Sequence, residues 1–321
     1  MSPSSSRTRG IAWALLTAVI SGVAVFLNSY GVRAAGNATV YTTAKNLVAA
    51  VMLVGAAAVA GWQSRRRNLP PATGQRSTRR LRLSRAQVAG LAVISVIGGS
   101  VPFVLFFEGL ARTSATDAAF MQKTLLIWVA LLAVPLLGER LGLAHLGAIA
   151  LLVAGQVAAT GGLAGLRAGS GEALVLGATL LWSVEVILAK RLLSGPAALT
   201  PLTVGVARMG LGSVLLVTWV AITGQFGSLT GLTGAAWGWA LLTGAILAGY
   251  VGTWFAALAS APAVDVTAVL VAGAIITALL SAMTTGATLP ASELLGLALV
   301  AAGAALMAIA PRLRRVPAAA G

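Results

Sequence analysis

The chain contains ten stretches of about 20 mostly apolar residues, the length that a helix needs to cross roughly 30 Å of hydrocarbon. Strands of a membrane barrel would alternate polar and apolar residues, and runs such as 125–137 show no alternation. We therefore predict an all-α integral membrane protein with ten transmembrane helices. The expected spans are 11–31, 39–60, 86–108, 115–137, 143–162, 172–193, 201–223, 235–258, 264–286 and 290–310.

The composition excludes a soluble protein. Hydrophobic residues make up 58% of the 321 residues and charged residues 9%, whereas soluble domains carry roughly 45–50% and about 25%. Seven acidic residues could not keep a soluble surface of this size hydrated. The absence of cysteine excludes a disulfide scaffold. No Walker-type loop is present, so an ATP-driven pump is excluded for this chain alone.

The basic residues are distributed unequally between the two sides of the predicted helices. With the N-terminus inside, 16 of the 22 Lys and Arg residues fall inside and 3 outside, and 3 lie within spans. An inside excess of Lys and Arg sets orientation, so we expect both termini to be cytoplasmic. The expected location is the cell membrane, or the inner membrane of a Gram-negative bacterium. The outer three are Arg33, Arg112 and Arg167, and those within spans are Lys45, Lys123 and Arg208.

Eight arginines lie in the predicted loop 61–85. Such a cluster can indicate nucleic-acid binding, but residues 63–85 include no aromatic side chain on which a base could stack. We interpret the loop as a cytoplasmic topology signal that also contacts anionic lipid. The expected partners are therefore a lipid bilayer and a small-molecule substrate, and not nucleic acid.

An internal repeat relates residues 110–155 to residues 258–303 at a constant offset. Each half then holds five helices, in residues 11–162 and 172–310, and an odd number gives the halves opposite orientations. Inverted repeats with a site near the membrane midplane are typical of secondary transporters that work by alternating access. The pairs matched at this offset are Leu110 and Leu258, Asp117 and Asp265, Gly138 and Gly286, and Gly155 and Gly303. Further towards the N-terminus, Ser21 matches Ser183 and Lys45 matches Arg208, with a one-residue slip between these two pairs.

Two charged residues are predicted to lie at the same depth in the membrane. At 1.5 Å per residue, Glu185 lies about 20 Å from the outer end of its helix, and Arg208 about 10 Å from the inner end of the next. We predict that they pair or share a cavity. Because charges inside a membrane are costly, we interpret Glu185 as functional, either titrating with a coupled proton or permanently ion-paired. The alternative is a structural ion pair.

Three more charges lie nearer the outer side. Lys45 and Lys123 each sit six residues from an outer helix end, about 9 Å deep, and Glu108 closes the third span within reach of either lysine if the helices adjoin. A cavity with both signs suits a zwitterion or an organic anion better than a bulky cation. The alternative is that the lysines extend to the interface and only hold helices in register.

Two tryptophans, Trp128 and Trp182, lie at mid-span, where interfacial anchoring cannot explain them. They either pack against neighbouring helices or form a wall of the cavity. Asp117 and Asp265 lie at helix starts and are expected to cap them. The only histidine, His145, has no second ligand at suitable spacing, so we predict no metal site and no cofactor.

The order of motifs resembles the EamA repeat of the drug/metabolite transporter superfamily over residues 11–310. In the first half the resemblance lies in 107–111, in Gly138-Glu139-Arg140-Leu141, and in Gly147 and Gly155; in the second it lies in 178–192. It implies a ten-helix exporter of small metabolites such as amino acids, with a central cavity lined by both halves. Two features depart from the family pattern: Ala287 replaces a common glutamate, and Glu108 and Lys123 are charged.

We therefore predict a secondary transporter or facilitator, and not an enzyme, that exports a small polar metabolite by alternating access. A channel and a non-transporting receptor or assembly factor remain as alternatives. The asymmetric set of charges disfavours a channel, which would use a repeated ring of pore-lining residues. A receptor would not need an inverted repeat. Export against import, proton coupling and a homodimer stay open.

Overall fold

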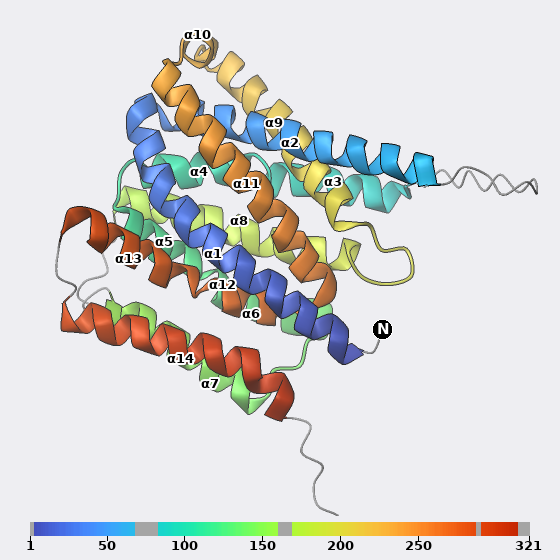
Figure 1. Ribbon diagram of the computed structural model, residues 1–321, viewed down its shortest axis with the longest axis vertical. Coiled ribbons are helices and arrows are strands. Elements are labelled where there is room, and N and C mark those ends of the chain that lie inside the picture. Colours follow the sequence, from blue (N-terminus) through green and yellow to red (C-terminus); the bar gives the residue numbers. More distant parts are fainter. Residues whose placement is uncertain (1–2, 68–82, 160–168, 287–289, 314–321) are drawn as a thin grey trace, which may run out of the picture.

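The computed structural model describes residues 3–67, 83–159, 169–286 and 290–313, and every regular element in them is a helix (Figure 1). The first-half helices are α1 (Pro3–Ala35), α2 (Ala38–Arg67), α3 (Arg85–Ile97), α4 (Val101–Leu110), α5 (Ala115–Lys123), α6 (Leu125–Leu137) and α7 (Leu143–Ala159). The second-half helices are α8 (Ser170–Leu192), α9 (Pro201–Ile222), α10 (Phe226–Thr230), α11 (Gly234–Ser260), α12 (Ala263–Leu270), α13 (Gly273–Thr285) and α14 (Ala291–Leu313). Most of the predicted basic loop, and Arg167 and Ala287, lie outside the described residues.

Eight helical segments of the described chain are long and apolar enough to cross a membrane. Two further apolar helices are shorter, His145–Gly155 within α7 and Ala291–Leu306 within α14. Large apolar side chains such as Val51 and Ile222 are exposed on the outside of the bundle, as expected for a surface that faces lipid. The chain is therefore an all-helical multi-pass membrane protein.

Three predicted spans are each divided into two helices. The third span breaks between α3 and α4 at residues 98–100, the fourth at Thr124, and the ninth at residues 271–272. At the last two breaks, which are equivalent in the repeat, Thr124 and Ala272 donate their backbone N–H to the carbonyl three residues earlier, which tightens the turn. Pro135, which interrupts a span in the sequence, lies inside α6.

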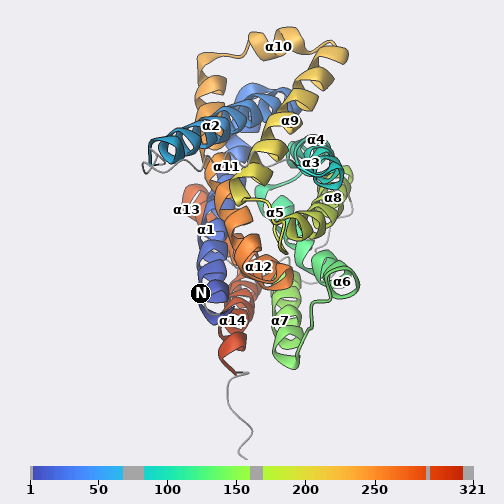
Figure 2. The same cartoon turned by 90° about the vertical axis from the view of Figure 1, so that its right-hand side faces the viewer.

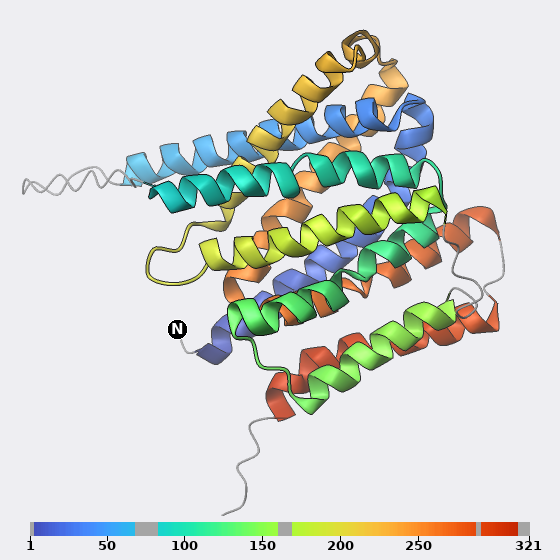
Figure 3. The same ribbon diagram turned by 180° about the vertical axis from the view of Figure 1, so that it is seen from behind.

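The two halves pack against each other in reciprocal pairs. The second helices of the halves, α2 and α9, are in contact, and so are the last helices, α7 and α14, which lie side by side at one edge of the bundle (Figure 1). The first helix of each half packs on the third and fourth spans of the other: α1 contacts α11 and α13, and α8 contacts α4 and α6. From behind, α8 runs beside the broken α3–α4 pair (Figure 3).

Two equivalent glycines end equivalent helices. Gly138 follows α6 and Gly286 follows α13, each with a φ of 66°, a left-handed conformation that favours glycine. The sequence match between these glycines therefore has a structural cause. The short α10, which the sequence analysis did not predict, crosses from α9 to α11 at one end of the bundle (Figure 2).

Candidate functional site

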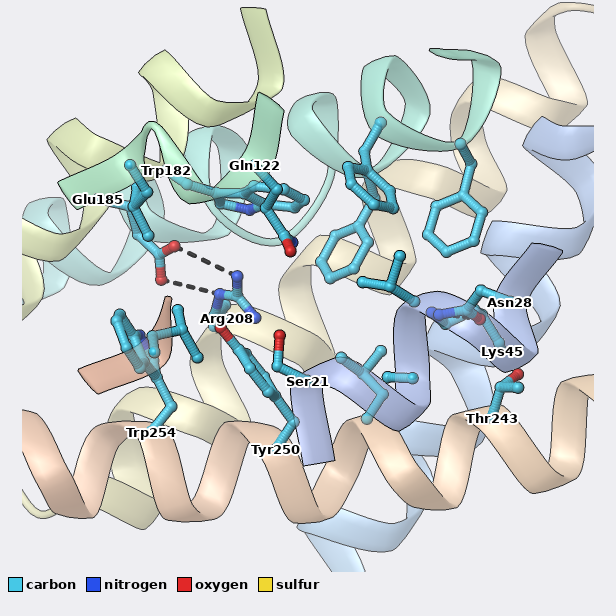
Figure 4. A pocket seen from close by; sticks show the side chains of 18 of the residues that line it. Ser21, Asn28, Lys45, Gln122, Trp182, Glu185, Arg208, Thr243, Tyr250 and Trp254 are labelled. Atoms are coloured by element: carbon cyan, nitrogen blue, oxygen red, sulfur yellow. Dashed lines mark hydrogen bonds and ion pairs between the residues drawn. The ribbon is translucent and has the colours of Figure 1, made fainter. Parts of the chain in front are cut away.

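A cavity of about 70 Å³ lies between helices of both halves, with room for several water molecules. Its wall is unusual for a membrane helix bundle because it combines polar and charged groups with aromatic rings. The polar and charged side chains are Ser21, Asn28, Lys45, Gln122, Glu185, Arg208 and Thr243. The aromatic side chains are Phe103, Phe106, Phe107, Trp182, Tyr250 and Trp254 (Figure 4).

Glu185 on α8 and Arg208 on α9 form an ion pair at one end of the cavity, as the sequence predicts. Arg208 Nε lies 2.8 Å from Glu185 Oε1, a contact without the alignment of a hydrogen bond, and Nη2 donates to Oε2 at 3.2 Å. The residues are 1% and 3% exposed. Both carboxylate oxygens of Glu185 thus face the guanidinium, which compensates much of the cost of burying either charge.

The break between α3 and α4 positions this ion pair. A Cβ at Gly98 would collide with the carboxylate of Glu185, and one at Gly99 would collide with the backbone of Arg208. The break also leaves the carbonyl of Gly98 free of the helix, and it accepts a hydrogen bond of 3.1 Å from the indole Nε1 of Trp182. The two glycines therefore allow α3 and α4 to approach both charged residues closely.

Lys45 on α2 points into the other end of the same cavity (Figure 4). Its ammonium donates to Asn28 Oδ1 at 3.2 Å and lies 4.3 Å from the centroid of the Phe107 ring. Asn28 Oδ1 also accepts from the hydroxyl of Tyr41 at 3.1 Å. Lys45 is only 2% exposed, so it does not extend to the surface of the bundle, which argues against the snorkelling alternative.

Lys123 lies beside the main cavity. Its ammonium donates to Ser21 Oγ at 3.0 Å and to Gln122 Oε1 at 3.2 Å, and both partners line the main cavity. Lys123 itself lines a smaller, mostly apolar cavity next to Leu152 and Val271. It is 4% exposed, so it too is enclosed by protein.

Two residues of the predicted site lie elsewhere. Glu108 accepts a hydrogen bond of 2.8 Å from Thr39 and pairs with Arg112 at 3.1 Å, and it makes no contact with Lys45 or Lys123 among the described residues. The pairing follows from helix geometry, because Arg112 lies one turn after Glu108. Trp128 on α6 does not line the main cavity, and its buried indole nitrogen has no hydrogen-bond partner among the described residues.

A second polar cluster lies at one end of the bundle, which we call the Asp265 end. Asp265 on α12 is 1% exposed and is bonded by Arg7 of α1 through Nε, at 2.8 Å from Oδ2, and through Nη2. His145 of α7 places Nε2 3.2 Å from Oδ1, while its Nδ1 accepts from the backbone N–H of Gly142. The predicted capping role of Asp265 is therefore wrong; Asp265 ties three helices together.

Glu139 takes the capping role instead. Its carboxylate accepts from the backbone N–H groups of Ala263 and Val264 at 2.6 and 3.1 Å, at the start of α12. Lys190 donates to the carbonyls of Leu258 and Ala261 at 2.7 and 2.8 Å, at the end of α11. The residues that join α11 to α12 are thus bonded by Glu139, which follows α6, and by Lys190 of α8.

This cluster is not apparent from the sequence, because its members are far apart in the chain: 258 residues separate Arg7 from Asp265. Asp117, which matches Asp265 in the repeat, makes different contacts. It exchanges hydrogen bonds only with Ser114, the residue before α5, among the described residues. Among the residues that the structure describes, no group of three or more His, Asp or Glu side chains could hold a metal ion.

Comparison with known proteins adds three findings. The model of the EamA-like transporter family matches the chain twice, over residues 8–160 and 169–309. One solved protein, described only as "Crystal structure of protein", superposes with a TM-score of 0.69 over 94% of this chain and 98% of that chain, at 16% identity. This likeness shows the fold alone. A search of curated proteins finds no significant match.

Proposed function

The chain belongs to the EamA-like transporter family, and from this premise we propose that it is a secondary transporter or facilitator of a small polar metabolite. The substrate is an amino acid, a similar zwitterion or an organic anion, and the direction is export. The observation that carries this proposal is the cavity between the two halves, which holds buried charges of both signs within an aromatic wall. Soluble polar metabolites need such groups to replace their water.

The proposed architecture is ten spans in two inverted five-helix halves, residues 11–162 and 172–310. Eight long apolar segments and the shorter apolar helices in α7 and α14 support that number. The reciprocal packing of the halves supports their relation by a pseudo-twofold axis. The excess of basic residues in 61–85 and near both termini supports cytoplasmic termini in a cell membrane.

The proposed mechanism is alternating access, in which one end of the bundle closes while the other opens. Its support is a difference between the surroundings of the two repeat-equivalent aspartates. At the Asp265 end, Arg7, His145 and Glu139 of the first half bond to the start of α12 in the second half. At the equivalent place in the first half, Asp117 bonds only within its own turn among the described residues. We interpret this conformation as closed at the Asp265 end, which is the cytoplasmic end in the proposed orientation.

Uptake by proteoliposomes tests the proposal. Labelled amino acids and organic anions are offered with and without a pH gradient, and at least one is expected to show saturable uptake above protein-free liposomes. Glu185→Gln should abolish or uncouple this flux, while the matched variant Glu108→Gln, whose carboxylate lies outside the cavity, should retain it. Saturable uptake of none of these compounds would contradict the transporter proposal.

A further inference from the structure

We propose that the cavity selects a small organic anion, whose carboxylate is bound by Lys45 and Asn28. This inference rests on the proposed transport function and narrows its substrate class, since it favours anions over zwitterions such as amino acids. The ligand's apolar body would lie along the aromatic wall, towards Glu185 and Arg208 (Figure 4).

The balance of charge around the cavity is the first argument. Glu185 and Arg208 face each other at one end and compensate each other. Lys45, at the other end, has no carboxylate partner among the described residues, since its contacts are one amide oxygen and two phenylalanine rings. A buried ammonium without a counter-ion is unfavourable. An anionic ligand would supply the missing charge.

The hydrogen-bond donors at the Lys45 end are the second argument. An ammonium has three donors, and the described residues accept one of them, at Asn28 Oδ1. That oxygen also accepts from the hydroxyl of Tyr41, so the amide nitrogen of Asn28 faces away from Lys45 and Tyr41. This nitrogen has no hydrogen-bond acceptor among the described residues. Both Lys45 and Asn28 line the cavity. Neighbouring donors of this kind suit the two oxygens of a carboxylate.

The aromatic wall is the third argument. Phe103 lies between the two charged ends, because its ring centroid is 5.8 Å from Lys45 Nζ and 5.4 Å from Arg208 Cζ. The two cations are therefore separated by no more than the sum of these distances, so both lie within reach of one small ligand. Trp182 continues the wall, with its ring centroid 5.6 Å from that of Phe103. The apolar body of a ligand would pack against these rings.

A zwitterion is less suited to this cavity than an anion. Its ammonium would need a carboxylate, and both oxygens of Glu185 already face Arg208. Glu108, the other nearby carboxylate considered from the sequence, lies outside the cavity and is bonded to Thr39 and Arg112. A bound zwitterion would thus leave its ammonium desolvated without a counter-ion.

Three probes with the same ring separate the charge classes: 3-phenylpropanoate, phenylalanine and 2-phenylethylamine. Their binding to the purified protein in detergent is measured by calorimetry at neutral pH. We expect the anion to bind at least about tenfold more tightly than the zwitterion, and the amine most weakly. Lys45→Met should weaken the anion by at least about tenfold and bring its affinity close to that of phenylalanine.

Arg33→Gln is the matched control, because it removes a positive charge from an exposed residue at the end of α1, outside the cavity. It should leave all three affinities unchanged. If Lys45→Met does not fold, the order of the three probes on the unaltered protein still decides. Equal affinity for the anion and the zwitterion, an unchanged anion affinity in Lys45→Met, or no anion binding up to about 10 mM would overturn the inference.

The failure of this inference is distinguishable from failure of the proposed function. Saturable transport of phenylalanine without a preference for the anion overturns the anion site and leaves the transporter proposal standing. Tight binding of 3-phenylpropanoate with no flux of any compound supports the anion site and contradicts transport.

Discussion

Arg208 on α9 lies against Glu185 on α8, with both oxygens of the carboxylate facing the guanidinium inside the bundle. The two side chains are almost fully buried. Such a pair adds little net stability, because desolvation offsets the attraction, but removing one partner leaves an uncompensated buried charge. The contribution of the pair to stability therefore has to be measured with both residues replaced as well as with one residue replaced.

A double-mutant cycle tests this coupling. Arg208→Met should lower the free energy of unfolding by about 3–5 kcal/mol because Glu185 is left unpaired in a buried place. Adding Glu185→Gln should restore most of the loss. Unfolding of the four proteins in one detergent gives the coupling energy, and purely additive effects would contradict the pairing.

The close approach at the break between α3 and α4 predicts a strong effect of one methyl group. Gly99→Ala should severely destabilise or misfold the protein, because the new Cβ would collide with the backbone of Arg208. Gly210→Ala is the matched control, since no atom lies within 4 Å of a Cβ there, and it should be neutral or stabilising by up to about 1 kcal/mol. The yield and thermal midpoint of both variants check the prediction. Equal behaviour of the two would contradict the packing.

The cluster at the Asp265 end should control access to the cavity from that side. The chain has no cysteine, so Leu270→Cys, on the cavity wall, provides a clean reporter. Asp265→Asn removes the negative charge that both Arg7 and His145 contact. We expect it to raise the rate of maleimide labelling from the cytoplasmic side several-fold, which is the effect of about 1 kcal/mol on a conformational equilibrium.

The control for this measurement is Glu108→Gln with the same reporter, because Glu108 lies away from the cluster and pairs with Arg112. Its labelling rate should match that of the reporter alone. A rate that is unchanged by Asp265→Asn would show that the cluster does not hold this end closed.

The proposed orientation predicts opposite labelling of two exposed sites. Leu83→Cys, just before α3, should react with a membrane-impermeant maleimide only from the cytoplasm, and Ala34→Cys, in the last turn of α1, only from outside. Intact cells and inside-out vesicles provide the two sides. The reverse pattern would invert the topology and place the Asp265 end outside.

The membrane fold is predictable because its constraints are local. Apolar length gives most of the spans, and the positive φ shared by Gly138 and Gly286 explains why the repeat is visible in the sequence. The break at Ala272 is not visible in it, because apolar residues continue through this position, and the break at Thr124 lies within a stretch long and apolar enough to be predicted as one span. Turns of this kind depend on hydrogen bonds that hydropathy does not report.

The site could be predicted from the sequence only where depth in the membrane alone determines which residues meet. Glu185 and Arg208 lie at the same depth in the membrane, and depth follows from the rise of a helix, so their pairing could be predicted. Glu108 lies at the outer end of its span, where Arg112, one helical turn later, is its partner. Asp265 and Arg7 come from opposite ends of the chain, and only the packing of α1 on α12 brings them together.

Counterflow in proteoliposomes tests the central claim most directly. Vesicles are preloaded with an excess of an unlabelled substrate, and the entry of a trace of the same labelled compound is followed. Alternating access through one cavity predicts transient accumulation of label above its equilibrium level, faster than in unloaded vesicles, and loss of this overshoot in Glu185→Gln but not in Glu108→Gln. Entry of label at the same rate with and without preloading, as through a channel or a bare bilayer, would contradict it.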